Sequence, residues 1–550
     1  MENEYSRQKI ITHFLDTQFD DYKKISRTKS KYKWTTLSHN GLKFPEQYIK
    51  RNVPLIYDGK EIVLSKEAEE VAFLYAKYIE TDYVSNPTFR KNFFNDFKKV
   101  LKDNSDIIKS LELCDFSLMK KKIDEEKELK TNLEKDQDQD QDNKYKTAYI
   151  DGKPESLSNY KMEPPGIFIG RGKNPNIGKV KLRINPDDVI INISRDVPVP
   201  EPPYGKWKKV IHDRSVEWLA SWKDSVLGKT KYLWLSAHSE MKTSNDQKKF
   251  DLAKKLKKKI HTINETNELN LKNSDEKIKQ IATALYFIDK LALRVGNEKG
   301  DDLTADTVGV TNLRVEHIVL SDNKITLDFL GKDSIRYENT ITVDPIIFNN
   351  VKEFINKKTK DEQIFDKIVS NDINKYLQSF MKNLTAKVFR TFNASNLFQK
   401  ELRKITKKYT DSIDDNTKAI LDDFIKANAK VAKMMNHQKN VSKGYKKTVD
   451  KLNTTLDNLK KKLAQARRKK KKNLKTIESI KEKIKNYKSK RELVKEMKNI
   501  SLGTSKANYI DPRITVAFMK LHKLDINKIF SSTLQKKFTW AFSVDENYKF

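Results

Sequence analysis

A tyrosine near the C-terminus stands in a sequence setting that suits chemistry better than packing. Tyr509 follows a polar stretch, residues 505–508, and precedes Asp511-Pro512, a pair typical of the N-cap and first position of a helix. A packing tyrosine belongs to a periodic apolar face, so this pattern predicts a side chain that is presented rather than buried. On a chain with a formal net charge of +34, such a phenol oxygen suggests a nucleophile that attacks a phosphodiester.

Transfer of a phosphodiester to a tyrosine needs cations for the non-bridging oxygens and a proton donor for the leaving 5′ oxygen. Arg294 and Arg390 each lie at the edge of an apolar pattern, and an arginine fork stays charged and binds two phosphate oxygens. Lys332, at a predicted hairpin tip, could deliver a proton, and His437 ends a predicted helix. Taken singly, each of these is most simply a solvated or structural side chain. The informative feature is their joint order, Arg, Lys, Arg, His, Tyr.

The composition limits the classes of protein to which the chain can belong. The chain has 550 residues, 37% of them hydrophobic, with 110 Lys and Arg against 76 Asp and Glu, so it can bury several cores and favours a polyanionic partner. A nucleic acid is favoured over a membrane surface as this partner, because the sequence has no apolar run of about 20 residues. The single cysteine, Cys114, excludes a disulfide framework and a multi-cysteine zinc site, which predicts an intracellular protein. The acidic, polar N-terminus predicts that there is no secretory signal.

Short strands and helices are predicted in the N-terminal part of the chain. Tyr57-Asp58-Gly59-Lys60 between two apolar runs predicts a β-hairpin, and Ser65 is the predicted cap of a helix that continues to Tyr83. Residues 98–145 are predicted to be mostly helical and to end in a solvated Asp/Gln loop at 136–142. A compact region of strands and turns is predicted over residues 163–203. The tryptophans that follow are predicted to pack in a core; they are Trp207, Trp218, Trp222 and Trp234.

The elements predicted further along the chain place the candidate residues. An apolar stripe predicts a helix from Ser274 that stops at Gly296, with Arg294 in its last turn. Residues 325–343 alternate between apolar and polar side chains around a turn, which predicts a β-hairpin with Lys332 at its tip.

Helices are predicted from Asp344-Pro345 to about Gln438, with the aspartate as N-cap. From Lys451 onward, leucines recur in a four-three alternation, which is typical of a coiled-coil seam. The seam breaks at the basic run 467–472 and restarts at Leu474. This pattern predicts two antiparallel helices that form an arm with little core of its own.

Longer segments surround these residues and appear in a characteristic order. They are Lys33-Trp34, Tyr57-Asp58-Gly59-Lys60, Arg90-Lys91-Asn92-Phe93-Phe94, Glu163-Pro164-Pro165-Gly166, Gly170-Arg171-Gly172, residues 284–294, Thr304-Ala305-Asp306-Thr307-Val308-Gly309, Leu313-Arg314-Val315-Glu316-His317, residues 329–337, Leu384-Thr385-Ala386-Lys387-Val388-Phe389-Arg390 and residues 505–513. From about Lys31 to the C-terminus, this set closely resembles eukaryotic-type DNA topoisomerase IB. The chain resembles a compact form of that family, without its long N-terminal extension.

The resemblance implies a chemical mechanism. Tyr509 would attack one DNA strand, form a 3′-phosphotyrosyl bond and free a 5′-hydroxyl. Arg294, Arg390 and His437 would hold the non-bridging oxygens, and Lys332 would protonate the leaving oxygen. Rotation of the cut strand followed by resealing would relax supercoils of either sign. No metal, ATP or other cofactor is implied, because one ester bond is exchanged for another and fixed cations stabilise the charge.

The resemblance also implies a monomer that binds duplex DNA and does not associate with membranes. Contacts to DNA are expected from Arg171, Lys299, Thr307, Lys387 and Asn508. The residues that match a camptothecin-type inhibitor site in the family are Arg171, Asp333 and Asn508. A nuclear location is expected, or a virion or viral factory if the chain comes from a DNA virus.

The expected fold is an α+β multidomain clamp around DNA. Residues 1–239 would form a DNA-binding cap of mixed strands and helices, and residues 240–440 a mainly α-helical catalytic core of the tyrosine recombinase and topoisomerase IB type. Residues 441–500 would form an antiparallel coiled-coil linker, and residues 501–550 a C-terminal domain with the nucleophilic tyrosine. Two alternatives stay open: a tyrosine recombinase, which uses the same chemistry on paired DNA sites, and a non-catalytic DNA-binding scaffold whose basic arm bridges duplexes.

Overall fold

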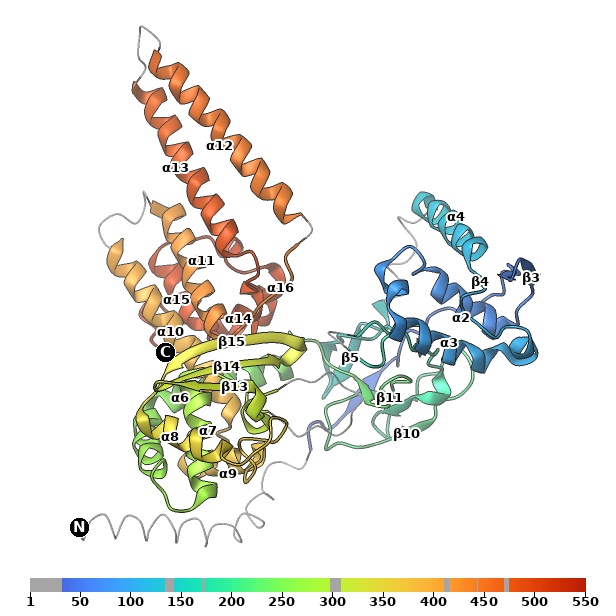
Figure 1. Cartoon of the computed structure of the whole chain (residues 1–550), viewed down its shortest axis with the longest axis horizontal. Coiled ribbons are helices and arrows are strands. Elements are labelled where there is room, and N and C mark those ends of the chain that lie inside the picture. The colour runs from blue at the N-terminus through green and yellow to red at the C-terminus, as the bar shows by residue number, and fades with distance from the viewer. Residues whose placement is uncertain are drawn as a thin grey trace. The chain divides into compact units, whose positions relative to one another are not determined.

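A computed structural model of the chain describes residues 32–133, 143–170, 174–296, 308–409, 416–442, 444–468 and 474–550 (Figure 1). The chain divides into two compact units, with the boundary between Lys242 and Thr243. The first unit mixes short strands with helices, and the second is mostly helical. The predicted Asp/Gln loop at residues 136–142 lies outside the described residues.

The first unit contains several small sheets. One has the order β1-β5-β6, a second β3-β2-β4, a third β10-β9-β11-β12, and β7 pairs with β8. All of these pairs are antiparallel except β10 and β9, which are parallel. The strands are β1 Leu37–His39, β2 Leu55–Tyr57, β3 Lys60–Ile62, β4 Cys114–Asp115, β5 Thr147–Ile150, β6 Lys153–Ser156, β7 Gly166–Ile167, β8 Val180–Lys181, β9 Ile190–Asn192, β10 Lys209–Ile211, β11 Ala220–Lys223 and β12 Thr230–Leu233. The strand-and-turn texture predicted for residues 163–203 is therefore confirmed.

The helices of the first unit are α2 Lys66–Ala76, α3 Pro87–Leu101 and α4 Ser117–Leu133. The predicted hairpin is formed by β2 and β3, and Asp58 and Gly59 take up its turn with positive φ angles of 48° and 75°. Ser65 caps α2 by accepting a hydrogen bond from the backbone N–H of Ala68. Helix α2 ends at Ala76 instead of Tyr83.

Two predictions for the first unit need correction. Residues 98–145 are only partly helical, because α3 ends at Leu101 and the polar turn formers that follow lead through a loop into β4 before α4 begins. The four tryptophans do not all pack in a core. Trp222 is buried and Trp207 and Trp218 are half-buried. Trp234, however, is 36% exposed, and the centre of its ring lies 4.8 Å from the ammonium of Lys242.

The second unit is built from long helices and one three-stranded antiparallel sheet in the order β13-β14-β15. The strands are β13 Ile318–Ser321, β14 Lys324–Gly331 and β15 Ile335–Thr342. The helices are α6 Glu240–Asn270, α7 Glu276–Lys290, α8 Pro345–Ile355, α9 Ser370–Phe380, α10 Ala386–Lys408, α11 Thr417–Met434, α12 Tyr445–Arg468, α13 Leu474–Glu496, α14 Leu502–Asn508, α15 Pro512–Leu521 and α16 Ser532–Lys537. One hydrophobic core extends from α6 to the last residue, Phe550.

The predicted hairpin around Lys332 is confirmed. Strands β14 and β15 pair along their whole length, so that Gly331 lies opposite Ile335 and the Phe329 ring stacks on Tyr337 with centroids 5.1 Å apart. Lys332 begins the single helical turn that joins the two strands. The buried register fixes the position of the tip.

The helix expected around Arg294 ends earlier than predicted. Helix α7 is capped by Asp275 and stops at Lys290, so Arg294 lies beyond its last turn. Ala292 takes a positive φ of 51°, and the Arg390 guanidinium donates to its carbonyl oxygen. The buried arginine thus fixes a bend that the apolar stripe of the sequence does not show.

Helices α12 and α13 form the predicted pair of long helices after His437 and lie side by side in Figure 1. Leu452, Leu456 and Ile477 are their buried residues. The connection at residues 469–473 lies outside the described residues. Among the helices that the structure describes, none has both the length and the apolar character needed to span a membrane.

Candidate active site

The second unit brings the five candidate residues of the predicted chemistry together. Arg294, Lys332, Arg390 and His437 line one pocket, and Tyr509 contacts three of them. The residues come from distant parts of the chain: the segment after α7, the tip between β14 and β15, the start of α10, the turn after α11 and the end of α14. Each element therefore contributes one group to a common centre.

Tyr509 is buried, contrary to the prediction of a presented side chain. Only 8% of Tyr509 is exposed. The segment before Tyr509 forms helix α14, and the tyrosine ring packs into the main core. The Arg390 guanidinium carbon lies 5.2 Å from the centre of the Tyr509 ring, and the His437 ring centre lies 5.1 Å away. Arg294 Nη1 donates to the Tyr509 hydroxyl oxygen at 3.2 Å. The hydroxyl is therefore held among cations even though the ring is covered.

This environment changes the acidity of the phenol. Burial by itself raises the pKa of Tyr509, but the charges of Arg390 and Arg294 and their hydrogen bonds outweigh it, and the pKa falls below its ordinary value. A lower pKa means that more of the phenolate, the nucleophilic form, is present near neutral pH.

Arg390 is a buried cation and is only 5% exposed. It donates to two backbone carbonyl oxygens, those of Ala292 and of Met435, the latter at 3.1 Å. Its Nε has no hydrogen-bond partner among the described residues. Burial, followed by the charge of Arg294, lowers the pKa of Arg390 to about 10, so the guanidinium stays charged near neutral pH.

Among the described residues, no carboxylate balances the positive charges of the pocket. In the described part of the chain, neither Arg294 nor Arg390 forms an ion pair with a carboxylate, and no Asp or Glu lines the pocket. Lys332 is exposed at the rim and likewise has no ion pair there. Because buried charges are normally paired, the arrangement favours an anion from outside the protein.

His437 is buried, with 6% of its side chain exposed. Its Nδ1 lies 2.7 Å from the Ser505 hydroxyl oxygen, and its Nε2 has no hydrogen-bond partner among the described residues. Burial and the charges of Arg390 and Arg294 lower the pKa of His437 to about 3. The imidazole is therefore neutral in the free protein at neutral pH.

Two glycines allow the Arg294 segment to approach its neighbour. A Cβ at Gly309 would lie 2.4 Å from both the Cα and the N of Gly296 and 2.9 Å from the Arg294 carbonyl oxygen. Gly296 itself has a φ of +88°, a region that favours glycine. Backbone hydrogen bonds from Val310 to Arg294 and from Thr311 to Val295 hold the two segments together.

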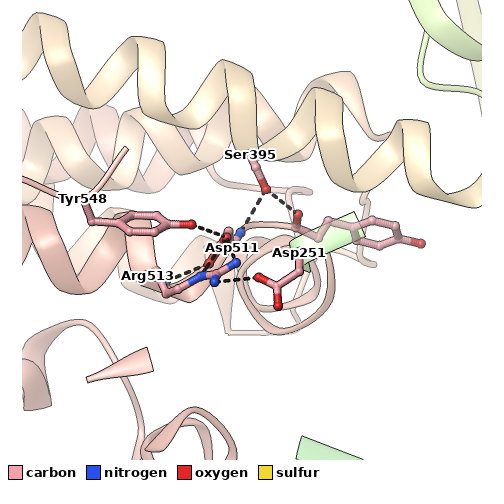
Figure 2. A network of polar contacts seen from close by, with 6 residues as sticks. Asp251, Ser395, Asp511, Arg513 and Tyr548 are labelled. Atoms are coloured by element: carbon pink, nitrogen blue, oxygen red, sulfur yellow. Dashed lines mark hydrogen bonds and ion pairs between the residues drawn. The ribbon is translucent and has the colours of Figure 1, made fainter. Parts of the chain in front are cut away.

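A buried polar network fixes the turn that carries Tyr509 (Figure 2). The Ser395 hydroxyl, on α10, donates to the Tyr509 carbonyl oxygen at 3.1 Å and accepts from the Asp511 N–H at 3.0 Å. Asp511 caps α15 as predicted and also receives hydrogen bonds from the Arg513 guanidinium and the Tyr548 hydroxyl. Arg513 in turn donates to Asp251 at 2.7 Å. Helix α10 thus carries Arg390 and also contacts the Tyr509 segment through Ser395.

The predicted DNA and inhibitor contacts are only partly described. Lys387 is exposed in the first turn of α10, one turn before Arg390, and Asn508 is exposed at the end of α14, where its side chain donates to the Thr504 carbonyl oxygen. Arg171, Lys299 and Thr307 lie outside the described residues, as does the side chain of Asp333.

The sequence interpretation assigned no role to Ser505, Ser395 or Gly309. Ser505 lies four residues before Tyr509, a spacing that places two side chains on one face of a helix, so this signal was available. Ser395 and Gly309 act across large sequence separations, 114 residues in the hydrogen bond from Ser395 to Tyr509. Only the folded chain reveals their contacts.

Three family models match consecutive parts of the chain. The family model for "Eukaryotic DNA topoisomerase I, DNA binding fragment" matches residues 32–235, and that for "Eukaryotic DNA topoisomerase I, catalytic core" matches residues 238–470. The model for "C-terminal topoisomerase domain" matches residues 481–550. The chain belongs to the eukaryotic DNA topoisomerase I family, the type IB class of topoisomerases.

Individual relatives are similar over nearly the whole chain. DNA topoisomerase 1 of Homo sapiens is 40% identical over 560 residues, which cover 94% of this chain and 72% of the human protein. DNA topoisomerase 1 of Caenorhabditis elegans is 40% identical, with 94% of this chain and 68% of the nematode protein covered. DNA topoisomerase 1 beta of Arabidopsis thaliana is 40% identical, with 94% and 59% covered.

Proposed function

We propose that this type IB topoisomerase cleaves and reseals one strand of duplex DNA through a covalent bond to Tyr509. The phenol oxygen attacks the scissile phosphorus, a P–O bond to Tyr509 forms, and the P–O5′ bond breaks. The phenol proton leaves to water and the departing 5′ oxygen takes one from Lys332, so the products are a 3′-phosphotyrosyl bond and a 5′-hydroxyl. Resealing is the reverse reaction and needs no ATP, because one phosphodiester replaces another.

The unbalanced cations around Tyr509 carry this proposal. Arg294 and Arg390 are charged, have no carboxylate partner among the described residues and lie beside the phenol. The negative charge on a phosphate grows on its non-bridging oxygens during attack, and preorganised donors at that place stabilise the transition state. His437 adds a third donor through Nε2, the buried atom that has no partner in the described chain.

Lys332 suits the role of general acid by its position. It lies at the exposed tip of a rigid hairpin and at the rim of the same pocket. A lysine on a flexible stem can reach the 5′ oxygen on the side of the phosphorus opposite Tyr509, as in-line displacement requires.

The rest of the chain would hold the duplex and permit rotation. We propose a DNA-binding cap over residues 1–239, a catalytic core of the tyrosine recombinase and topoisomerase IB type over 240–440, a coiled-coil linker over 441–500 and a C-terminal domain over 501–550. The chain acts as a monomer on duplex DNA in the nucleus, or in a virion or viral factory if its source is a DNA virus. With a net charge of +34, binding is mostly to phosphates and weakens steeply with salt.

The test is the change Tyr509→Phe, which removes only the attacking oxygen. We expect loss of supercoil relaxation and of the covalent adduct trapped by detergent, while DNA binding keeps its affinity and salt dependence. Tyr149→Phe, at a tyrosine that is 51% exposed, is the matched control and should relax DNA normally. Both reactions are run with EDTA and without ATP. Relaxation by the Tyr509→Phe protein would contradict the proposal.

A further inference from the structure

The Ser505 hydroxyl makes one hydrogen bond among the residues that the structure describes, and its partner is His437 Nδ1 at 2.7 Å. Ser505 is fully buried, so water does not offer an alternative acceptor. On the other side of the ring, Nε2 is buried and has no partner in the described chain. The two ring nitrogens therefore have different environments, one occupied within the protein and one open to a ligand.

These environments select one tautomer of the neutral imidazole. If the serine hydroxyl donates to Nδ1, its proton is used and the ring hydrogen is placed on Nε2. In the other tautomer, Nδ1–H donates to the serine oxygen, which leaves the buried hydroxyl proton without an acceptor. That tautomer also turns the Nε2 lone pair toward a phosphate oxygen, which repels it. The first arrangement satisfies every group once a phosphate is bound.

We propose that Ser505 is a positioning residue that holds His437 as the Nε2–H tautomer, so that the neutral imidazole donates to a non-bridging phosphate oxygen. The inference rests on the proposed function, because it assumes that a phosphate occupies the pocket. It adds a residue that touches neither the phosphate nor the phenol oxygen and acts through His437.

The backbone of Ser505 links the Ser505–His437 hydrogen bond to the segment that carries Tyr509. Its carbonyl oxygen accepts the N–H groups of Tyr509 at 2.9 Å and Ile510 at 3.0 Å, so the serine that orients His437 also ends the helix on which Tyr509 stands. In addition, the Ser501 N–H donates to the His437 carbonyl oxygen at 2.8 Å. The donor and the nucleophile are thus fixed to the same short helix, α14.

The tautomer can be measured without any reaction. In the full-length protein labelled with ¹⁵N-histidine, the His437 signal is identified by its loss in His437→Gln. We expect the wild type to show Nε2 protonated and Nδ1 as a bare acceptor. Ser505→Ala should shift both nitrogens toward a mixture of tautomers. Protonation of Nδ1 in the wild type, or an unchanged spectrum in Ser505→Ala, would overturn the inference.

A double-mutant cycle then connects the tautomer to the reaction. The single-turnover cleavage rate of Ser505→Ala is expected to fall roughly tenfold, which corresponds to one buried hydrogen bond to the phosphate. In the His437→Gln background the same change should have no further effect. An equal loss in both backgrounds would show a merely structural role and contradict the inference.

Ser395→Ala is the matched control. It removes an equally buried hydroxyl that contacts the Tyr509 segment and not His437. We expect it to leave the His437 spectrum unchanged and to have the same effect on cleavage with and without His437. The outcomes separate the two proposals: relaxation by Tyr509→Phe refutes the function, whereas a wrong tautomer in an active wild type refutes only the role of Ser505.

Discussion

At the scale of single residues, the site combines an acidified phenol with cations that have no carboxylate partner among the described residues. Arg294 and Arg390 lower the pKa of Tyr509 against the effect of burial. Burial, together with the same two charges, lowers the pKa of His437 and keeps it neutral. A phosphate that enters the pocket balances these charges. Under the proposed mechanism, the pocket is therefore better suited to bound DNA than to the empty state.

The role of Lys332 can be tested with the leaving group. Lys332→Ala should slow cleavage of ordinary DNA by about 10²- to 10⁴-fold, the usual contribution of a general acid. A substrate with sulfur in place of the bridging 5′ oxygen should be cleaved at nearly the wild-type rate, because a thiolate leaves without a proton. The measurement is the single-turnover rate of covalent adduct formation.

Lys324→Ala provides the control for Lys332. Lys324 is an exposed lysine at the first position of β14, whereas Lys332 follows the last, and the loss of Lys324 should leave the rate on both substrates unchanged. An equal defect of Lys332→Ala on the oxygen and sulfur substrates would assign the lysine to phosphate binding instead of proton transfer.

At the scale of elements, the site depends on how closely segments approach one another. The segment after α7 packs backbone against backbone at Gly296 and Gly309, and Arg294 of this segment contacts Tyr509. The β14–β15 hairpin holds its tip by a full ladder of pairs, and α10 contributes both Arg390 and Ser395. A small displacement of any of these elements separates groups that must act together.

Gly309→Ala tests the approach of the Arg294 segment. Its φ is −128°, which alanine adopts without strain, so the change acts through the close contacts with Gly296 and the Arg294 carbonyl oxygen. We expect DNA binding close to that of the wild type and a loss of cleavage of about 10²-fold, the effect of misplacing a reacting group by about 1 Å.

Gly444→Ala is the control for this prediction, because a Cβ at Gly444 would meet nothing within 4 Å. It should cleave DNA at the wild-type rate. Normal cleavage by the Gly309→Ala protein would show that the Arg294 segment tolerates displacement and that the close glycine contact has no part in catalysis.

At the scale of the whole second unit, the C-terminal helices pack directly on the helical core. Ile500 packs with Ala429 and Ala432 of α11, the Ser501 N–H bonds the His437 carbonyl oxygen, and α15 contacts α10. The paired helices α12 and α13 bury few side chains apart from their mutual contact. The α12–α13 pair therefore connects two parts of the second unit, the helical core and the C-terminal helices, which already pack against each other.

Two fragments, residues 1–440 and residues 500–550, should accordingly restore activity when mixed. We expect relaxation that rises with the concentration of the smaller fragment, because the covalent link no longer supplies a high effective concentration. Co-purification and relaxation assays measure the two parts of this expectation, with Tyr509→Phe in the smaller fragment as the inactive control. Failure of well-folded fragments to associate would show that the arm is needed for assembly.

The sequence by itself determined the features that depend on local chemistry. Turn formers and alternation predicted the Lys332 hairpin, Asp511-Pro512 predicted the start of α15, and the leucine pattern predicted the two arm helices, all of which are confirmed. Local preferences suffice there, because the turn residues, caps and apolar stripes lie within one element. The order of the candidate residues also identified the family correctly.

Only the tertiary structure decided how these groups meet. It buried Tyr509 instead of presenting it, ended α7 before Arg294, and brought Ser395 and Gly309 to the site. The physical reason is that burial, backbone approach and pKa depend on neighbours from distant parts of the chain. The bend at Ala292, for example, is contacted by Arg390, 98 residues further on, through a hydrogen bond to the Ala292 carbonyl oxygen, and no local pattern records this contact.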